Sequence, residues 1–227
     1  MERYSLIHDK FPREFVLLQG TGCRWKKCAY CDYFHDVSEN PYELNSKELE
    51  KVTGHYGVLD VINSGSAMEL DKDTITLIKH IVAEKKIHTI WFESHYMYRT
   101  HLEKFARQFA PAKVKFRCGI ETFDASLRNK WNKGIPSEVT ARDVAKYFDG
   151  ICLLCGTKGE SKERIISDIN TALKYFEYIS VNLFNKNTTS IEVDEDLQRW
   201  FVTEVYPHIK DNPAIEVLLQ NTDLGVG

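Results

Sequence analysis

Residues 14–31 read Glu14-Phe-Val-Leu-Leu-Gln-Gly-Thr-Gly-Cys-Arg-Trp-Lys-Lys-Cys-Ala-Tyr-Cys31. Residues 14–19, with the apolar run at residues 15–18, are typical of a strand, and the Gly-Thr-Gly turn after them predicts its end. Three cysteines follow with the spacing C-x4-C-x2-C, at Cys23, Cys28 and Cys31. Three thiolates on one loop can ligate three irons of a cubane cluster and leave one iron open to a small molecule.

Two plainer interpretations of this loop stay open. One is a structural zinc site that His35 or another cysteine completes. The other is a cysteine triplet that holds no metal. Two lysines inside the motif, Lys26 and Lys27, favour thiolate chemistry, because positive charge nearby stabilises the deprotonated thiol.

The same order, a short apolar run and then a helical pattern, recurs along the chain. Strands are predicted at residues 14–19, 57–62, 89–93, 113–121, 149–155, 178–184 and 215–219. Helices are predicted from about residue 46 and at residues 73–84, 101–109, 125–133, 137–147, 161–176 and 195–205. This alternation predicts an α/β fold with a parallel sheet and right-handed crossovers, either doubly wound or barrel-like. In a barrel the chemistry lies at the carboxyl ends of the strands, which is where the cysteine loop falls.

The composition indicates one globular domain over residues 1–227, with 43% hydrophobic and 28% charged residues. The formal net charge of −3 provides no basic field for nucleic acid or an anionic membrane, so neither is expected as a partner. The first eight residues are too few and too polar for a signal peptide, and no apolar run approaches the roughly 18 residues of a membrane span. These features predict a cytoplasmic protein.

The cysteine loop resembles that of the radical S-adenosylmethionine (SAM) superfamily. The usual spacing there is C-x3-C-x2-C with an aromatic residue just before the last cysteine, and Tyr30 occupies that position as a cofactor-binding candidate. This chain has one extra residue in the first gap. The resemblance implies a partial (βα)6-type barrel with its core at residues 14–187, a [4Fe-4S] cluster on Cys23, Cys28 and Cys31, and SAM as a further cofactor. The cluster and SAM would then generate a 5'-deoxyadenosyl radical that takes hydrogen from a substrate.

Further positions look like cofactor-binding positions of the same superfamily, and each follows a predicted strand. Gly65 and Ser66 stand where the superfamily binds the SAM amino group, although only one glycine is present and no acid follows at once. Glu121 follows Gly-Ile, where an acid commonly reaches the SAM ribose or amino group. Gly156 opens a Gly-x-x-Gly-Glu motif, and Asn185 ends a strand that often touches the adenine. A plain turn at Gly65 and Ser66, and a solvated acid at Glu121, are the alternatives.

The other three cysteines, Cys118, Cys152 and Cys155, are expected to be buried structural residues. Cys152 and Cys155 lie on one predicted strand. Residues three apart on a strand face opposite sides, which disfavours a second metal site there.

The length of the chain favours a small substrate. A barrel core and a C-terminal helix, strand and tail at residues 195–227, predicted to cover the active site, nearly use up the sequence. The chain is similar to the small lyases of bacterial queuine salvage in three features: its size, its C-x4-C-x2-C variant and its tail Asn221-Thr-Asp-Leu-Gly225. That resemblance implies a deazapurine-like substrate, queuine, from which 7-aminomethyl-7-deazaguanine is released.

Candidate substrate-binding and catalytic residues follow from the chemistry of a deazaguanine. Its Watson–Crick edge has N–H donors that pair with a carboxylate, and its flat face packs on an aromatic ring. The candidates are His95, Tyr96, Arg99 and Asp223, with Asp36, Asn40 and Tyr42 as weaker ones. Catalytic roles stay unassigned, since a loop rich in His and Tyr is often only partly buried surface.

Other partners and functions remain in view. Lysines and arginines near the cysteine loop can receive an electron-donor protein such as flavodoxin. A glycyl-radical-enzyme activase is the second enzyme hypothesis, and it would need a surface that docks a protein. A zinc- or cluster-binding module without catalysis is the third, although the net charge of −3 and the absence of a basic stripe count against nucleic-acid binding.

Overall fold

The computed structural model describes residues 1–227, and the chain forms two compact units. The first unit contains residues 1–26, 33–116 and 224–227, and the second contains residues 27–32 and 117–223. The strands follow one another in chain order, β1-β2-β3-β4-β5-β6-β7-β8. Strand β5 (Lys113–Glu121) begins in the first unit and ends in the second. The expectation of a single domain stays a prediction.

The first unit contains three parallel strands with an antiparallel strand beside them. Its strands before β5 are β1 (Tyr4–Ile7), β2 (Arg13–Leu18), β3 (Val58–Asn63) and β4 (Thr89–Glu93). Strands β2, β3 and β4 pair in parallel, whereas β1 runs antiparallel to β2. β2 is buried along its whole length, and its last four residues, 15–18, form a continuous apolar run and not an alternating one.

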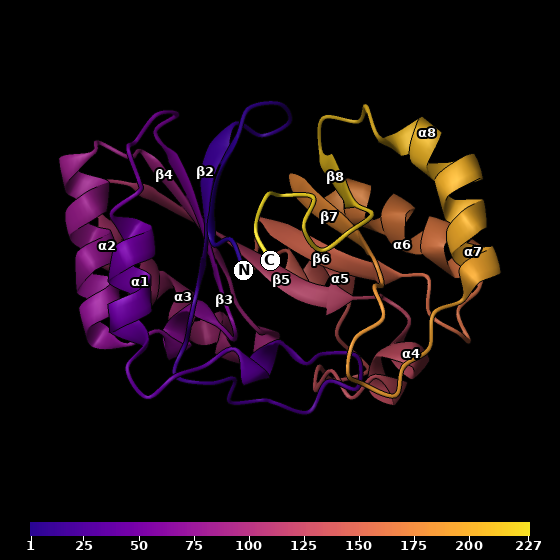
Figure 1. The fold of residues 1–227 in the computed structure, drawn as a ribbon. Helices are drawn as coiled ribbons and strands as arrows, with labels where there is room; N and C mark the ends of the chain where they lie inside the picture. The colour runs from indigo at the N-terminus through magenta and orange to yellow at the C-terminus, as the bar shows by residue number, and fades with distance from the viewer. The chain divides into compact units, whose positions relative to one another are not determined.

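Helices of the first unit follow its strands along the chain. They are α1 (Pro41–Leu49), α2 (Lys72–Glu84) and α3 (Leu102–Ala106), with 3-10 turns at Tyr33–His35, Ala67–Glu69, Tyr96–His101 and Arg107–Phe109. Figure 1 shows α1 and α2 lying side by side. The side chain of Asp71 caps α2 by accepting a hydrogen bond from the Thr74 N–H (2.8 Å), and the helix buries Ile78, Ile81 and Val82.

All strands of the second unit are parallel. After β5 they are β6 (Gly150–Cys155), β7 (Tyr178–Leu183) and β8 (Ile215–Leu218). The helices are α4 (Ala125–Lys130), α5 (Ala141–Val144), α6 (Lys162–Tyr175), α7 (Glu195–Trp200) and α8 (Tyr206–Ile209), with a π-helical turn at Phe201–Val205. Helix α6 contacts both β6 and β7, as the crossover between two parallel strands must (Figure 1). None of the helices in the chain is long and apolar enough to cross a membrane.

The predicted strands agree with the observed ones to within one residue at each end, but β1 was not predicted. The first helix starts at Pro41 and not near residue 46, because proline suits the first helical position. The helix expected at residues 137–147 shrinks to α5, since Thr140 caps it and accepts a hydrogen bond from the Asp143 N–H (3.3 Å). The helix expected at residues 195–205 ends at Trp200, where the π-helical turn begins.

Candidate cofactor site

In the first unit, the start of the cysteine loop is held by one buried carboxylate, that of Glu69. Its Oε1 accepts hydrogen bonds from the backbone N–H of Arg24 (2.8 Å) and from the Tyr98 hydroxyl (2.9 Å). Its Oε2 accepts one from the backbone N–H of Ser66 (2.6 Å). The Glu69 carbonyl also accepts from the Thr21 N–H (2.9 Å). Glu69 therefore joins the cysteine loop to the turn that follows β3.

That turn lies directly against Cys23. A Cβ on Gly65 would lie 3.3 Å from Cys23 Cα and 2.2 Å from Glu69 Oε2, so glycine is needed for this close approach. Cys23 Sγ accepts a hydrogen bond from the backbone N–H of Lys26 (3.3 Å). The first unit thus brings Cys23, Gly65 and Ser66 together.

In the second unit, the other end of the loop packs on an apolar cluster. Cys28 and Cys31 pack against a cluster of Tyr30, Leu127, Trp131 and Phe184, in which the Tyr30 and Trp131 rings meet edge-on at 5.6 Å between centroids. The loop is anchored to the same place by the Ala29 N–H, which donates to the Trp131 carbonyl (2.9 Å). Burial, with the negative charges of Glu121 and the two thiolates, raises the pKa of Tyr30 well above its ordinary value, so its hydroxyl remains a donor.

The Tyr30 hydroxyl belongs to a closed triad of buried polar groups. It donates to Glu121 Oε1 (3.0 Å), while Lys133 Nζ donates both to Glu121 Oε1 (2.8 Å) and to the Tyr30 oxygen (2.8 Å). Glu121 itself has φ +67, in a region that non-glycine residues seldom adopt, and the register of β5 against β6 shifts between Gly119 and Glu121. Such backbone strain is found where surrounding contacts hold a side chain in a functional position.

Two residues of these arrangements, Glu69 and Lys133, were not among the candidates drawn from the sequence. Glu69 carried a usable signal, because Ser66-Ala-Met-Glu69 is a capping-box pattern that places an acid three residues after the turn. Lys133 carried a weaker one, its place in the turn Trp131-Asn-Lys-Gly134 after α4.

Gly156 and Asn185 also lie in the second unit, each at the end of a strand. Gly156 has φ +90 and donates its N–H to Glu160 Oε2 (3.0 Å). Asn185 Nδ2 donates to the carbonyls of Leu183 (2.8 Å) and Leu219 (3.2 Å). Burial raises the pKa of Glu160 to about 7, against hydrogen bonds from its neighbours that favour the charged form.

Three of the four main substrate candidates lie together after β4 in the first unit. His95 stacks on Trp25 with 5.7 Å between ring centroids, and its Nδ1 accepts a hydrogen bond from the Met97 N–H (3.1 Å). The guanidinium of Arg99 lies 4.7 Å from the centroid of the Tyr96 ring, which is buried. Trp25 comes from the cysteine loop itself, so this aromatic pair connects that loop to the β4 end.

The fourth candidate, Asp223, lies in the second unit and is exposed. Its Oδ2 accepts hydrogen bonds from the N–H groups of Leu219 (2.7 Å) and Gln220 (2.9 Å), which closes the turn after β8. The chain then returns to the first unit, where the Gly227 N–H donates to the Glu2 carbonyl (2.8 Å).

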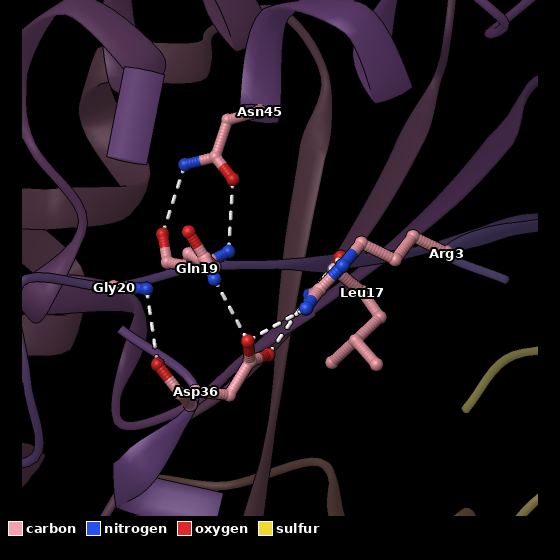
Figure 2. Close-up of polar contacts among 7 residues, drawn as sticks. Arg3, Leu17, Gln19, Gly20, Asp36 and Asn45 are labelled. Carbon is pink, nitrogen blue, oxygen red and sulfur yellow. Dashed lines mark hydrogen bonds and ion pairs between the residues drawn. The ribbon is translucent and has the colours of Figure 1, made fainter. Parts of the chain in front are cut away.

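Asp36 forms the centre of a polar network in the first unit (Figure 2). Arg3 binds both of its carboxylate oxygens, at 2.8 and 2.6 Å, and Gln19 Nε2 donates to Oδ1 (2.8 Å). Burial would raise the pKa of Asp36, but the hydrogen bonds from Arg3 and Gln19 lower it below its ordinary value. Asn45 extends the network by binding the backbone of Gln19 through two hydrogen bonds of 2.8 Å. The other weak candidates are Asn40, which precedes α1 without a side-chain cap bond, and the exposed Tyr42.

The thiols of the loop suit an iron–sulfur cluster by their chemistry. Cys23, Cys28 and Cys31 are partly exposed, and none of the six cysteines forms a disulfide. Cys118, Cys152 and Cys155 are buried in strands, as expected. No three His, Cys, Asp or Glu side chains gather as a metal site.

Comparison with known proteins extends these observations. The chain matches no protein-family model and no curated protein. Among solved structures it is similar to queuine lyase from Clostridium spiroforme bound to SAM and queuine, with 40% sequence identity and a TM-score of 0.95. The match covers 100% of this chain and 99% of that chain. The likeness confirms the predicted α/β partial-barrel fold.

Proposed function

Since the chain belongs to the radical SAM family of queuine lyase, we propose that it is itself a lyase of queuine salvage, which acts on queuine and releases 7-aminomethyl-7-deazaguanine. The observation that carries this proposal is the likeness, over the whole chain, to an enzyme bound to SAM and queuine. The cofactors are a [4Fe-4S] cluster and SAM, which when bound supply a 5'-deoxyadenosyl radical that removes a hydrogen atom from the substrate.

The proposed cluster ligands are Cys23, Cys28 and Cys31. Their partial exposure and their place on one short loop support this assignment, because the other cysteines are sealed within strands. The hydrogen bond from the Lys26 N–H to Cys23 Sγ is of the kind that tunes cluster sulfurs.

The proposed SAM-binding residues surround both ends of the same loop. Gly65 and Ser66 approach Cys23 in the first unit, and Tyr30 with Glu121 lies beside Cys28 and Cys31 in the second. A carboxylate such as Glu121 accepts hydrogen bonds from an ammonium group or from ribose hydroxyls, which are the donors that SAM offers. Gly156 and Asn185, at two neighbouring strand ends of the second unit, are assigned to the adenine end.

For queuine, the candidates remain His95, Tyr96, Arg99 and Asp223. The stack of His95 on Trp25 provides a flat surface of the kind that a deazaguanine ring packs on. Asp223 is an accessible carboxylate that would pair with the N–H donors of the base once its turn contacts are exchanged.

We further propose that the enzyme works in the cytoplasm with a one-electron donor protein such as flavodoxin, and without nucleic acid as a partner. Lys26 and Lys27 are exposed within the cysteine loop and supply positive charge for a donor with an acidic docking face.

The test is turnover by anaerobically reconstituted protein. With dithionite, SAM and queuine, we expect 5'-deoxyadenosine and 7-aminomethyl-7-deazaguanine to accumulate, as measured by mass spectrometry. Cys28→Ala is expected to abolish both products and to lower bound iron, whereas Cys152→Ala, a buried cysteine outside the loop, serves as the matched control and retains both.

Two outcomes would contradict separate parts of the proposal. Intact SAM cleavage with unchanged queuine would remove queuine as the substrate. A protein that takes up no iron and never cleaves SAM would remove the radical SAM assignment.

A further inference from the structure

The two oxygens of the Glu121 carboxylate have different surroundings. Oε1 accepts hydrogen bonds from both Tyr30 and Lys133, while Oε2 accepts none within the chain and is not sealed from solvent. The residue as a whole is only 8% exposed. A carboxylate that is clamped through one oxygen and open at the other can accept from a ligand through the open oxygen alone.

Lys133 supplies the charge in this clamp. Its ammonium group is buried, with 10% side-chain exposure, and it binds Glu121 Oε1 and the Tyr30 oxygen at the same distance of 2.8 Å. Burial alone would lower the pKa of Lys133, but attraction to Glu121 and to the Cys28 thiolate raises it above its ordinary value. The lysine therefore stays charged throughout the physiological range.

The backbone is shaped to admit this clamp. A Cβ on Gly119 would lie 2.6 Å from Glu121 Oε1 and 3.0 Å from Lys133 Nζ, so any larger residue there would push the pair apart. The positive φ of Glu121 adds strain, which persists only where side-chain contacts hold it. Neither feature is needed to fill the core with apolar side chains.

We propose that Lys133 is a positioning residue for SAM: together with Tyr30 it fixes Glu121 by Oε1, so that Oε2 is held ready for the ammonium or hydroxyl donors of SAM. This inference rests on the proposed function, because it assigns a ligand to Glu121. Lys133 acts through Glu121 and is not itself required to touch SAM. Charge-assisted hydrogen bonds of this type are the strong ones, and pre-orientation spares the ligand the cost of ordering the side chain.

The experiment compares SAM and queuine affinities in reconstituted holoenzyme by anaerobic equilibrium dialysis. Lys133→Met removes the ammonium but keeps the stem, and Lys133→Arg keeps the charge. Lys130→Met, an exposed lysine in the same segment, is the matched control. Glu121→Gln and the double variant with Lys133→Met complete a double-mutant cycle.

We expect Lys133→Met to weaken SAM binding by about 10- to 100-fold, because a Glu121 carboxylate that is no longer held in place loses its charge-assisted hydrogen bond to SAM. Queuine affinity and bound iron should stay at the parent level, Lys133→Arg should recover part of the loss, and Lys130→Met should match the parent. The double variant should bind SAM no more weakly than Glu121→Gln alone, because Lys133 has nothing left to position. Where Lys133→Met does not fold, Tyr30→Phe takes its place, since it deletes the hydrogen bond to Oε1 and the one from Lys133 Nζ but keeps the ring.

The possible failures can be told apart. If Glu121→Gln weakens SAM binding but Lys133→Met and Tyr30→Phe do not, the positioning role of Lys133 is wrong while the SAM site stands. If the two losses add in the double variant, Lys133 does not act through Glu121, and the inference is again overturned. If the parent binds no SAM at all, it is the proposed function that fails.

Discussion

Replacing Glu69 by alanine should separate the start of the cysteine loop from the turn that supports it. The substitution deletes three hydrogen bonds at once, from the Arg24 N–H, the Ser66 N–H and the Tyr98 hydroxyl. Burial, and then the hydrogen bond to Glu69, raises the pKa of Tyr98 to about 12, so this hydroxyl is a donor at any pH used in the assay.

The three lost bonds do not weigh equally. Ser66 is buried, so its N–H would be left without a partner, at a cost of about 1–3 kcal/mol. Arg24 is exposed and Tyr98 is half-buried, so both regain water and each loses only about 0.5–1.5 kcal/mol. The free energy of unfolding of the apo protein should therefore fall by about 2–6 kcal/mol in Glu69→Ala, and by about 1 kcal/mol in Tyr98→Phe.

Urea unfolding of the apo protein, together with iron content after anaerobic reconstitution, tests this reasoning. Glu69→Ala should retain clearly less iron than the parent, because the backbone next to Cys23 has lost its anchor. Glu50→Ala, an exposed acid at the end of α1, should behave like the parent in both measurements. An ordinary surface substitution changes the free energy of unfolding by no more than about 0.5 kcal/mol. If Glu69→Ala stays within that range of the parent and binds the same amount of iron, the carboxylate does not hold the loop.

Three more expectations follow from contacts within single units. Folding raises the pKa of Glu160 from its ordinary value of 4.5 to about 7. The folded protein therefore binds the proton more tightly, and its free energy of unfolding should fall by about 3 kcal/mol as pH rises from about 4.5 to 7. Urea unfolding at several pH values should show a flatter dependence for Glu160→Gln. Asp36→Asn should destabilise the protein by about 2 kcal/mol, because it weakens the paired hydrogen bonds of the buried Arg3, and unchanged thermal unfolding would contradict this. Gly65→Ala should lower both the free energy of unfolding and iron uptake, because its Cβ would displace the Glu69 carboxylate from its three donors. Parental iron content in this variant would show that the backbone of the turn can shift to make room for the Cβ.

Much of the fold could be predicted from the sequence because its determinants are local. Parallel strands buried on both faces are mostly apolar, so β2, β6 and β7 stand out as short runs between turns. Strand β1 was not predicted because it is only four residues long and half-buried. Its pairing with β2 depends on register, which no local pattern reveals. The helix predicted at residues 137–147 was overestimated for a different reason: the local capping box of Thr140 and Asp143 makes α5 begin only at Ala141.

The residues of the candidate site also differ in whether their signals are local in the sequence. The cysteine spacing and the Gly65 turn are local, and both were found. Glu69 has a local capping-box bond to Ser66, but its contact with the cysteine loop is to a residue 45 positions before it, and Lys133 binds Tyr30 from 103 positions away. An acid or a lysine near a turn is usually solvated, so only the fold can show that these two are buried and paired.

The division of the chain also explains why one motif needs two supports. The cysteine loop is continuous in sequence, yet Cys23 belongs to the first unit and the other two cysteines to the second. Each end accordingly has a carboxylate of its own, Glu69 with its three donors for the first end and Glu121 in its triad with Lys133 for the second. These two carboxylates share no partner, so their contributions to stability should be close to independent. Loss of Glu69 is therefore expected to lower bound iron, whereas loss of the Lys133 ammonium is not, because the second end of the loop keeps its bond from the Ala29 N–H to the Trp131 carbonyl.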